Sequence, residues 1–189
     1  MGSSGNPASP EQVAQELSGP LHRYLQRYSG SDTVADDLLQ ETLIRIVRGL
    51  PAFEGRASLK TWAFSIATRV AADHFRKPAN RAHIVEIDEC AEFPDAESGV
   101  DEQLVAGEMN ACIRQVVESL PEDYRAALVL HDWEGLTAAQ IAEVCGCSVA
   151  TAKIRIHRAR LRLKDALERE CDFYHDSGSV LRCDRKSDE

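Results

Sequence analysis

Apolar side chains recur every three or four positions along most of this chain of 189 residues, and glycine, proline or serine separates the periodic segments. That spacing gathers the apolar side chains on one face of a helix. It predicts helices over residues 11–28, 34–50 and 100–119, and a glycine-bearing basic loop that leads into a basic helix within residues 52–77. Gly19-Pro20 is an expected interruption of the first helix, because proline lacks the N–H that a helix interior uses. The pattern indicates an all-α protein that is long enough for two small domains.

The same spacing predicts which side chains form the cores. The first three helices are expected to bury Val13, Leu17, Leu21 and Leu25, then Leu39, Leu43, Ile46 and Leu50, then Leu59, Trp62, Ala63, Ile66 and Val70. Trp62 suits a core position or a platform on which a nucleic-acid base stacks, and its helical spacing favours the core.

Residues 136–167 predict a helix-turn-helix. Leu136-Thr137 opens a short helix through Ile141, and Gly146 marks the turn. Ser148 can cap a second helix by accepting a hydrogen bond from an unpaired backbone N–H. A short helix, a tight turn and a longer helix in this order are typical of proteins that place the second helix in the major groove of DNA.

The second helix of this pair has one apolar and one basic side. The inward positions are Ala152, Ile156, Ala159, Leu163 and Leu167. The outward positions are Thr151, Lys153, Ile154, His157 and Arg158, with Arg155, Arg160, Arg162 and Lys164 on the flanks. Cations at such positions can bind phosphates while the outermost side chains reach base edges.

Charge is unevenly distributed along the chain. The formal net charge is −9, which opposes binding to phosphate. Between Arg81 and Arg114 there is no lysine or arginine, while acidic residues accumulate. We therefore expect an acidic linker between two basic elements. Contacts with DNA are expected to depend on this separation of basic from acidic residues, or on a basic partner protein.

No apolar run reaches the roughly 20 residues that span a bilayer, and the first residues lack a signal-peptide pattern. The sequence thus predicts a cytoplasmic protein without membrane insertion. The six cysteines are scattered, so reduced thiols are expected. Cys145 and Cys147 flank a glycine in the predicted turn, and core packing is favoured there over a soft-metal site.

Three segments in order resemble one family: VADDLLQETLIRIVRG (34–49), FEGRASLKTWAFSIATRVAADHFRK (53–77) and LPEDYRAALVLHDWEGLTAAQIAEVCGCSVATAKIRIHRAR (120–160). They are similar to a bacterial sigma factor of the extracytoplasmic-function (ECF) group of the sigma-70 family, over about Leu17 to Leu167. The resemblance implies a first helical domain that binds core RNA polymerase and melts the −10 promoter element, and a second that reads the −35 element. It implies an initiation subunit, with no enzymatic activity and no required cofactor.

The resemblance divides the chain into five parts. They are a disordered tail (1–10), a sigma region 2 domain (11–81), a flexible acidic linker (82–99), a region 4 helix-turn-helix domain (100–168) and a cysteine-containing tail (169–189). It also implies that the polymerase-binding faces have apolar edges that an inhibitory anti-sigma factor can cover.

The site residues are likewise implied by the resemblance. Polymerase binding is expected at Asp37, Gln40, Glu41 and Arg45. Contacts with the −10 element are expected from Arg56, Leu59, Lys60, Arg69, Arg76 and Lys77. Contacts with the −35 element are expected from Thr151, Lys153, Ile154, Arg155, His157 and Arg158.

Two of these positions depart from the family pattern. Many members have asparagine where this chain has Arg69, which only donates hydrogen bonds, so the preferred −10 base is open. A small polar residue is frequent at the position of Ile154. The Ile154 side chain can contact the methyl group of thymine, or it can cover a neighbouring helix or a partner.

The tail beyond residue 170 adds ligand-type side chains. Cys171, His175 and Cys183 flank a turn that favours a small hairpin, with residues 180–181 beside residues 173–174. They can form a metal site, a Cys171–Cys183 disulfide or a purely structural hairpin.

Two other functional classes stay open at this stage. One is a stand-alone helix-turn-helix regulator that binds duplex DNA without polymerase. The other is a metal- or redox-sensing DNA-binding protein, which rests on the cysteines alone.

Overall fold

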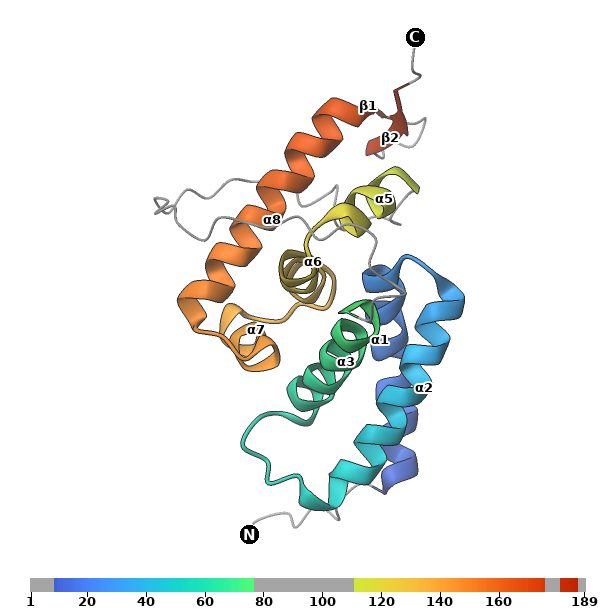
Figure 1. Cartoon of the computed structure of the whole chain (residues 1–189), viewed down its shortest axis with the longest axis vertical. Helices are drawn as coiled ribbons and strands as arrows, with labels where there is room; N and C mark the ends of the chain where they lie inside the picture. Colours follow the sequence, from blue (N-terminus) through green and yellow to red (C-terminus); the bar gives the residue numbers. More distant parts are fainter. Residues whose placement is uncertain (1–8, 77–110, 176–180, 187–189) are drawn as a thin grey trace.

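The computed structural model describes residues 9–76, 111–175 and 181–186. In the first part lie α1 (Pro10–Ser29), α2 (Asp32–Gly49), the 3-10 turn η1 (Leu50–Ala52) and α3 (Leu59–Arg76). The second holds α5 (Ala111–Ser119), α6 (Glu122–Leu128), the π-helical turn η3 (Val129–Trp133), α7 (Ala138–Cys145), α8 (Val149–Glu170) and the strands β1 (Cys171–His175) and β2 (Leu181–Arg185). Two helical units therefore follow each other, as expected (Figure 1).

α1 begins at a capping box and runs without a break. The Ser9 side chain accepts from the Gln12 N–H, and the Gln12 side chain accepts from the Ser9 N–H. The expected interruption at Gly19-Pro20 is wrong, because Pro20 lies inside the helix. Leu17 and Leu21, on either side of it, are 6% and 0% exposed. Burial of these side chains offsets the one backbone hydrogen bond that proline cannot make.

α2 buries a face that is rotated from the predicted one. Ile46 is buried as expected, but Leu39, Leu43 and Leu50 are only partly buried. The other buried positions are Ala35, Leu38 and Thr42. α2 packs against both α1 and α3, so small residues lie where the helices approach closely. Thr42 is tolerated there because its hydroxyl donates to the Leu38 carbonyl at 2.7 Å.

α3 packs its inner face against α1 through aromatic contacts. Phe64 meets the Tyr24 ring edge-on at 5.3 Å between centroids. The Tyr24 hydroxyl lies 2.9 Å from the Thr68 hydroxyl, so this buried polar group has a partner. Trp62 packs on Phe53 at 4.9 Å and is partly buried against the core. This packing accords with the predicted core role of Trp62.

Both helices of the helix-turn-helix begin at a side-chain cap, and the cap at Ser148 was predicted. Thr137 and Gln140 form a capping box at the start of α7, and Gly146 ends that helix with a φ of 66°. The Ser148 side chain then accepts from the Thr151 N–H at 3.0 Å and starts α8. All five predicted inward positions of α8 are buried: Ala152, Ile156, Ala159, Leu163 and Leu167.

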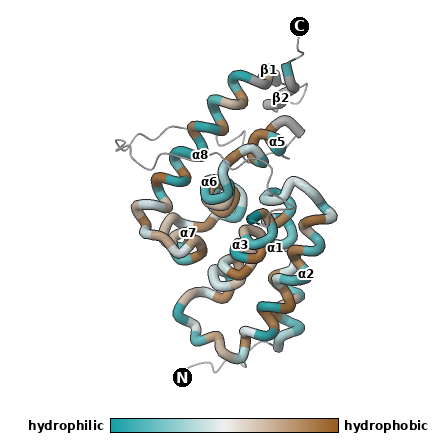
Figure 2. The backbone as a smooth tube through the Cα atoms, viewed as in Figure 1, coloured by the Kyte–Doolittle hydropathy of each residue, from teal (hydrophilic) through white to brown (hydrophobic). Residues whose placement is uncertain are grey.

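The two helical units pack against each other. α3 contacts α7, and α1 contacts both α5 and η3. In Figure 1, α3 lies between α1 on one side and the α6–α7 pair on the other. Hydrophobic and hydrophilic positions alternate along α1, α2, α3 and α8, as expected for helices with one buried face (Figure 2).

A small hairpin extends the second unit. β1 and β2 pair antiparallel, with Phe173 opposite Cys183 and His175 opposite Leu181. The predicted hairpin is thus present, with a register shifted from the one expected. α8 continues to Glu170, directly before β1. Among the residues that the structure describes, no helix is long and apolar enough to cross a membrane.

Candidate nucleic-acid interface

The outer face of α2 carries the four residues predicted to bind polymerase. Asp37, Gln40, Glu41 and Arg45 are all exposed on one side of the helix. Arg45 pairs with Glu41 at 2.7 Å and lies 3.8 Å from the Asp73 carboxylate of α3. The Arg45–Asp73 pair links this face to α3, although exposed pairs add little stability.

Two exposed apolar side chains complete this face, and the sequence reasoning missed them. Ile44 is 37% exposed and Val47 is 40% exposed. An apolar patch with a polar rim is typical of protein interfaces. The sequence did contain a signal for this patch, because both apolar residues lie at positions where the helical pattern predicts polar ones.

The predicted −10 residues divide into two groups. Arg56 belongs to the segment that leads into α3, where Gly55 has a φ of 71°, and Leu59 is the first residue of α3. The Arg56 side chain is 87% exposed and lies 3.1 Å from the Glu54 carboxylate. Lys60, Arg69 and Arg76 lie on α3, and Lys77 is outside the described residues.

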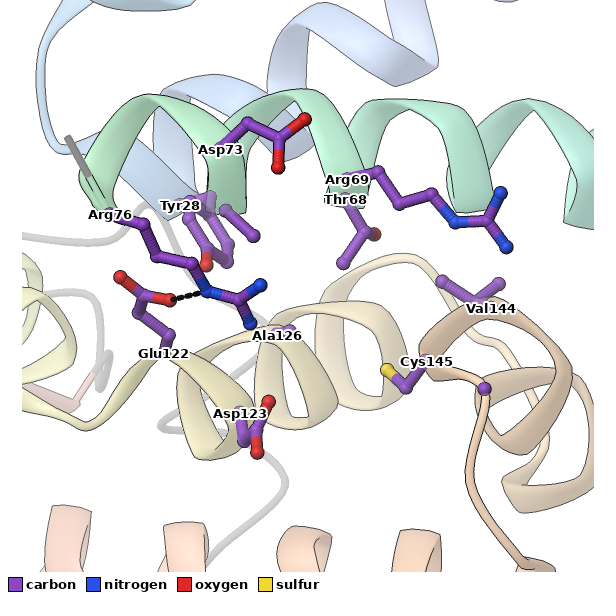
Figure 3. A pocket seen from close by; sticks show the side chains of 12 residues that line it. Tyr28, Thr68, Arg69, Asp73, Arg76, Glu122, Asp123, Ala126, Val144 and Cys145 are labelled. Carbon is purple, nitrogen blue, oxygen red and sulfur yellow. Dashed lines mark ion pairs between the residues drawn. The ribbon is translucent and has the colours of Figure 1, made fainter. Parts of the chain in front are cut away.

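A pocket of about 210 Å³ lies between α3 and the α6–α7 pair. Arg69 and Arg76 line it from α3, and the Glu122 carboxylate of α6 points towards Arg76 (Figure 3). The Arg76 Nε lies 3.7 Å from the Glu122 Oε2. Partial burial raises the pKa of Glu122 above its usual value although Arg76 and Arg125 oppose the shift.

A second charged contact joins the units near η3. The Glu134 carboxylate, 5% exposed, accepts from Arg27 of α1 at 3.0 Å. Its backbone carbonyl accepts from the Lys60 Nζ at 3.2 Å. Burial raises the pKa of Glu134, although Arg27, Arg23 and Lys60 oppose the shift.

Arg125 of α6 joins three helix ends. Its guanidinium donates to the Tyr28 carbonyl at 3.0 Å, in the last turn of α1. It also donates to the carbonyls of Glu118, in the last turn of α5, and of Leu120, directly after that helix. A cation suits this place because the carbonyls at a helix C-terminus lack partners within the helix. The guanidinium also lies over the rings of Tyr28 and Phe75, at 5.4 and 5.9 Å.

The predicted −35 residues lie on the outer side of α8. Lys153 and Ile154 are exposed, and the Ile154 side chain is 46% exposed. Arg155 donates to Asp123 at 2.6 Å, and Arg158 donates to the Tyr124 hydroxyl at 3.4 Å. His157 and Thr151 are half-buried. Two of the proposed phosphate-binding cations are therefore also bound within the protein.

Arg160, expected on a flank of α8, has a partner within the protein. It forms an ion pair with Asp132, whose carboxylate is 2% exposed. Burial raises the pKa of Asp132, but hydrogen bonds from His131 and Arg160 together lower it below its usual value. This pair ties α8 to η3. The sequence pattern does not predict this ion pair, because Arg160 and Asp132 are far apart along the chain.

The cysteines differ from the expected set of reduced thiols. Cys145 and Cys147 are free, as expected, and burial raises the pKa of Cys145 to about 12. That thiol stays protonated at neutral pH, which argues against metal chemistry at this turn. Cys171 is 2% exposed and disulfide-bonded, so the expectation of a reduced thiol there is wrong.

The disulfide also removes Cys171 as a metal ligand, since ligation needs a free thiolate. The side chains of His175 and Cys183, the other predicted ligands, lie outside the described residues. Among the side chains that are described, no group of three or more His, Cys, Asp or Glu residues could hold a metal ion.

Comparisons with known proteins agree with this arrangement. Residues 13–81 match the model of sigma-70 region 2, and residues 110–163 match that of sigma-70 region 4. The chain is 29% identical over 166 residues to the RNA polymerase sigma factor SigZ of Bacillus subtilis, covering 88% of this chain and 91% of that protein. It is 33% identical over 148 residues to the ECF RNA polymerase sigma factor EcfG of Rhodopseudomonas palustris, covering 78% of each.

A solved structure shares the arrangement of helices. The sigma factor RpoE, in complex with the anti-sigma factor NepR from Bartonella quintana, superposes with a TM-score of 0.64 at 26% identity, over 84% of this chain and 96% of that one. Because both sigma-70 regions match in order and relatives above 30% identity align over most of their length, this chain belongs to the ECF group of the sigma-70 family of RNA polymerase sigma factors.

Proposed function

We propose that the chain binds core RNA polymerase through the outer face of α2 and directs it to promoters that α3 and α8 recognise. The observation that carries this proposal is the exposed face of α2, where Ile44 and Val47 lie among the charged positions 37, 41 and 45. A stand-alone regulator has no need for an apolar patch on a helix that is remote from its DNA reader. This face therefore favours a polymerase subunit over the regulator.

Promoter reading is assigned to two surfaces. We assign contacts with base edges of the −35 element to Lys153 and Ile154 of α8; this assignment is supported by their exposure, and Ile154 suits a thymine methyl group. The basic residues around α3 are placed along the opened −10 strand, where cations bind phosphates and an unstacked base can be held. The ranges 11–81 and 100–168 are the two functional domains in this proposal.

We assign no enzymatic activity to the chain, and it needs no cofactor in this role. The RpoE relative is solved with an anti-sigma factor, and the apolar patch on α2 would suit an inhibitory partner of that kind. Because this role requires core polymerase and DNA, we expect the protein to act in the cytoplasm.

Run-off transcription with core polymerase and a library of promoter sequences tests the proposal. We expect transcripts to depend on the chain and to start from a restricted set of sequences. Specific, tight binding to duplex DNA in the absence of polymerase, without stimulation of transcription, would instead support a stand-alone regulator.

A further inference from the structure

We propose that the first two turns of α8 read the C5-methyl groups of pyrimidines in the major groove, with Val149 and Ile154 contacting methyl groups on two separate base pairs. This inference rests on the proposed function of α8 and deepens it, because it names the chemical group that the helix recognises and adds Val149 as a second reader. The methyl group belongs either to thymine or to 5-methylcytosine, which present it at the same place in the groove.

The start of α8 exposes an unusual number of apolar side chains. Val149 is 44% exposed and Ile154 is 46% exposed, so two of the five exposed large apolar side chains in the described part of the chain lie here. Ala150, between them, is exposed as well. Single apolar side chains on a surface are normal, but a cluster of them marks a binding surface. Its place on the helix assigned to DNA indicates what it binds.

The polar groups at this end of α8 leave few other ways to read a base. The Ser148 side chain accepts from the Thr151 N–H at 3.0 Å, and the two hydroxyl oxygens lie 2.8 Å apart, so both side chains are engaged in the helix cap. Between Val149 and Ile154, Lys153 is the one exposed polar side chain. The remaining contacts with base edges are therefore apolar, and the apolar group that a base presents in the major groove is the C5-methyl group.

The spacing of Val149 and Ile154 suits two base pairs. Five residues of an α-helix rise by about 7.5 Å, and successive bases of a strand are about 3.4 Å apart along the DNA axis. At about 100° per residue, Lys153 and Ala150 lie between the two side chains around the helix. The first residues of a recognition helix are those that reach base edges. We therefore expect the two methyl contacts to lie about two base-pair steps apart.

Both side chains are β-branched, which suits recognition without a hydrogen bond. In a helix, valine and isoleucine have one strongly preferred χ1 rotamer, so contact with a base restricts them little. The helix beneath them is fixed as well, because Ala152 and Ile156 are 0% and 6% exposed. Pre-organised side chains lose little entropy on binding, so a contact as small as a methyl group can contribute to affinity.

The charges around this apolar tip suit duplex DNA. Lys153 is exposed within it, and Arg155 and Arg158 are half-buried on the neighbouring flank of α8. Apolar side chains flanked by cations match a groove whose walls are phosphates and whose floor carries methyl groups. The occupant of this surface is therefore duplex DNA in our proposal.

The test uses holoenzyme, formed from core polymerase and the full chain, and a promoter duplex selected by run-off transcription. Deoxyuridine replaces thymine at each −35 position in turn, on either strand. This change removes the methyl group and leaves the donors and acceptors of the base in place. Filter binding at constant salt measures the affinity. We expect roughly fourfold weaker binding at two positions, the loss that corresponds to one buried methyl group.

A second series of duplexes distinguishes the two sources of the methyl group. In it, 5-methylcytosine replaces cytosine at each −35 position in turn, on either strand. Weaker binding with deoxyuridine supports thymine as the ligand. Tighter binding with 5-methylcytosine, again by roughly fourfold, supports methylated cytosine.

Two variants assign each methyl group to a side chain. Val149→Ala and Ile154→Ala shorten one reader at a time, and each variant is the matched control for the other. Alanine favours the helical conformation, so we expect both variants to keep α8, which circular dichroism checks. Each variant should lose the sensitivity to the methyl group at one position and retain it at the other.

Three results would overturn the inference. Equal binding of wild-type holoenzyme to all the modified duplexes is the first, and the proposed function survives it if transcription still starts from a restricted set of promoters. The second is methyl sensitivity that both variants retain at both positions, because the methyl group then acts through the shape of the DNA itself. The third is a wild-type holoenzyme that selects no promoter, which refutes the proposed function and this inference together.

Discussion

Arg155 of α8 donates a hydrogen bond to the carboxylate of Asp123 on α6, with 2.6 Å between Nη2 and Oδ2. The Asp123 side chain is 58% exposed, so the pair lies at the protein surface. A cation that we place near a phosphate of the −35 element is thus already neutralised in the free protein. Binding to DNA requires Arg155 to exchange a carboxylate for a phosphate.

We therefore expect Asp123→Asn to strengthen binding of the holoenzyme to all promoters similarly, because Arg155 is released and a nearby negative charge is lost. The slope of log affinity against log salt should steepen by about one. Filter binding across a salt series measures the affinity for promoters and the slope. Asp165→Asn, at an exposed position on α8, is the control for net charge. Equal gains from both variants would show that the Arg155–Asp123 pair has no special role.

Lys153 should set base preference, because its side chain is exposed at the outermost position of α8. Lys153→Ala is expected to change discrimination at one or two base pairs of the −35 element by roughly 1–3 kcal/mol. Transcription from a promoter library measures the preference. Arg158→Ala, by contrast, should weaken binding to all sequences alike, since we assign that residue to a phosphate. An unchanged promoter profile for Lys153→Ala would refute the assigned register of α8.

Charge reversal on α2 should weaken polymerase binding. In Asp37→Lys/Glu41→Lys both changes lie on the exposed face, so helical content should be retained. Loss of the Glu41–Arg45 pair costs only a few tenths of a kcal/mol. The affinity for core polymerase, measured by pull-down without DNA, should fall. Glu16→Lys/Glu143→Lys makes the same change in net charge at exposed positions elsewhere, and equal affinity of the two double variants would refute the α2 assignment.

Sequence reasoning succeeded where the signals are local. The cap at Ser148 involves residues three positions apart, and the inward face of α8 follows from one helical period. The rotation of the α2 face could not be predicted, because it depends on α2 packing against two helices at once. Pro20 was misjudged for the same reason, since tertiary burial outweighed a local preference.

The contacts between the two units were also missed. Glu134 and Arg125 appear in the sequence as ordinary charged residues, and their roles depend on partners about a hundred positions away. Such pairs leave no spacing pattern in a single sequence. Ile44 and Val47 could have been found, because each is an apolar side chain on a side of α2 that the periodicity leaves exposed.

Glu134 should make stability depend on pH. Burial raises its pKa above the usual 4.5, with Arg27, Arg23 and Lys60 opposing the shift. A raised pKa means that its stabilising contribution is complete below pH 4.5 and is lost as pH rises through the folded-state pKa. Glu134→Gln, which resembles the protonated acid, should therefore raise the free energy of unfolding at pH 7 and flatten this part of the pH profile. Urea unfolding across pH measures it, with Glu143→Gln as the exposed control.

The disulfide at Cys171 should stabilise the second unit without setting its promoter preference. Cys171 is buried where α8 meets β1, while the core of the helix-turn-helix ends at Leu167. A disulfide typically contributes about 2–4 kcal/mol, mainly by restricting the unfolded chain. We expect Cys171→Ala to lower the melting temperature under oxidising conditions, and a reductant to lower that of the wild type to a similar value. Cys147→Ala, which removes a free thiol, should respond to reductant as the wild type does.

Because the cytoplasm keeps most thiols reduced, the disulfide at Cys171 would form there only under oxidative conditions. A melting temperature of the wild type that is the same with and without reductant would show that the bond contributes no stability. A promoter profile that changes with the reductant would show that the tail regulates DNA reading.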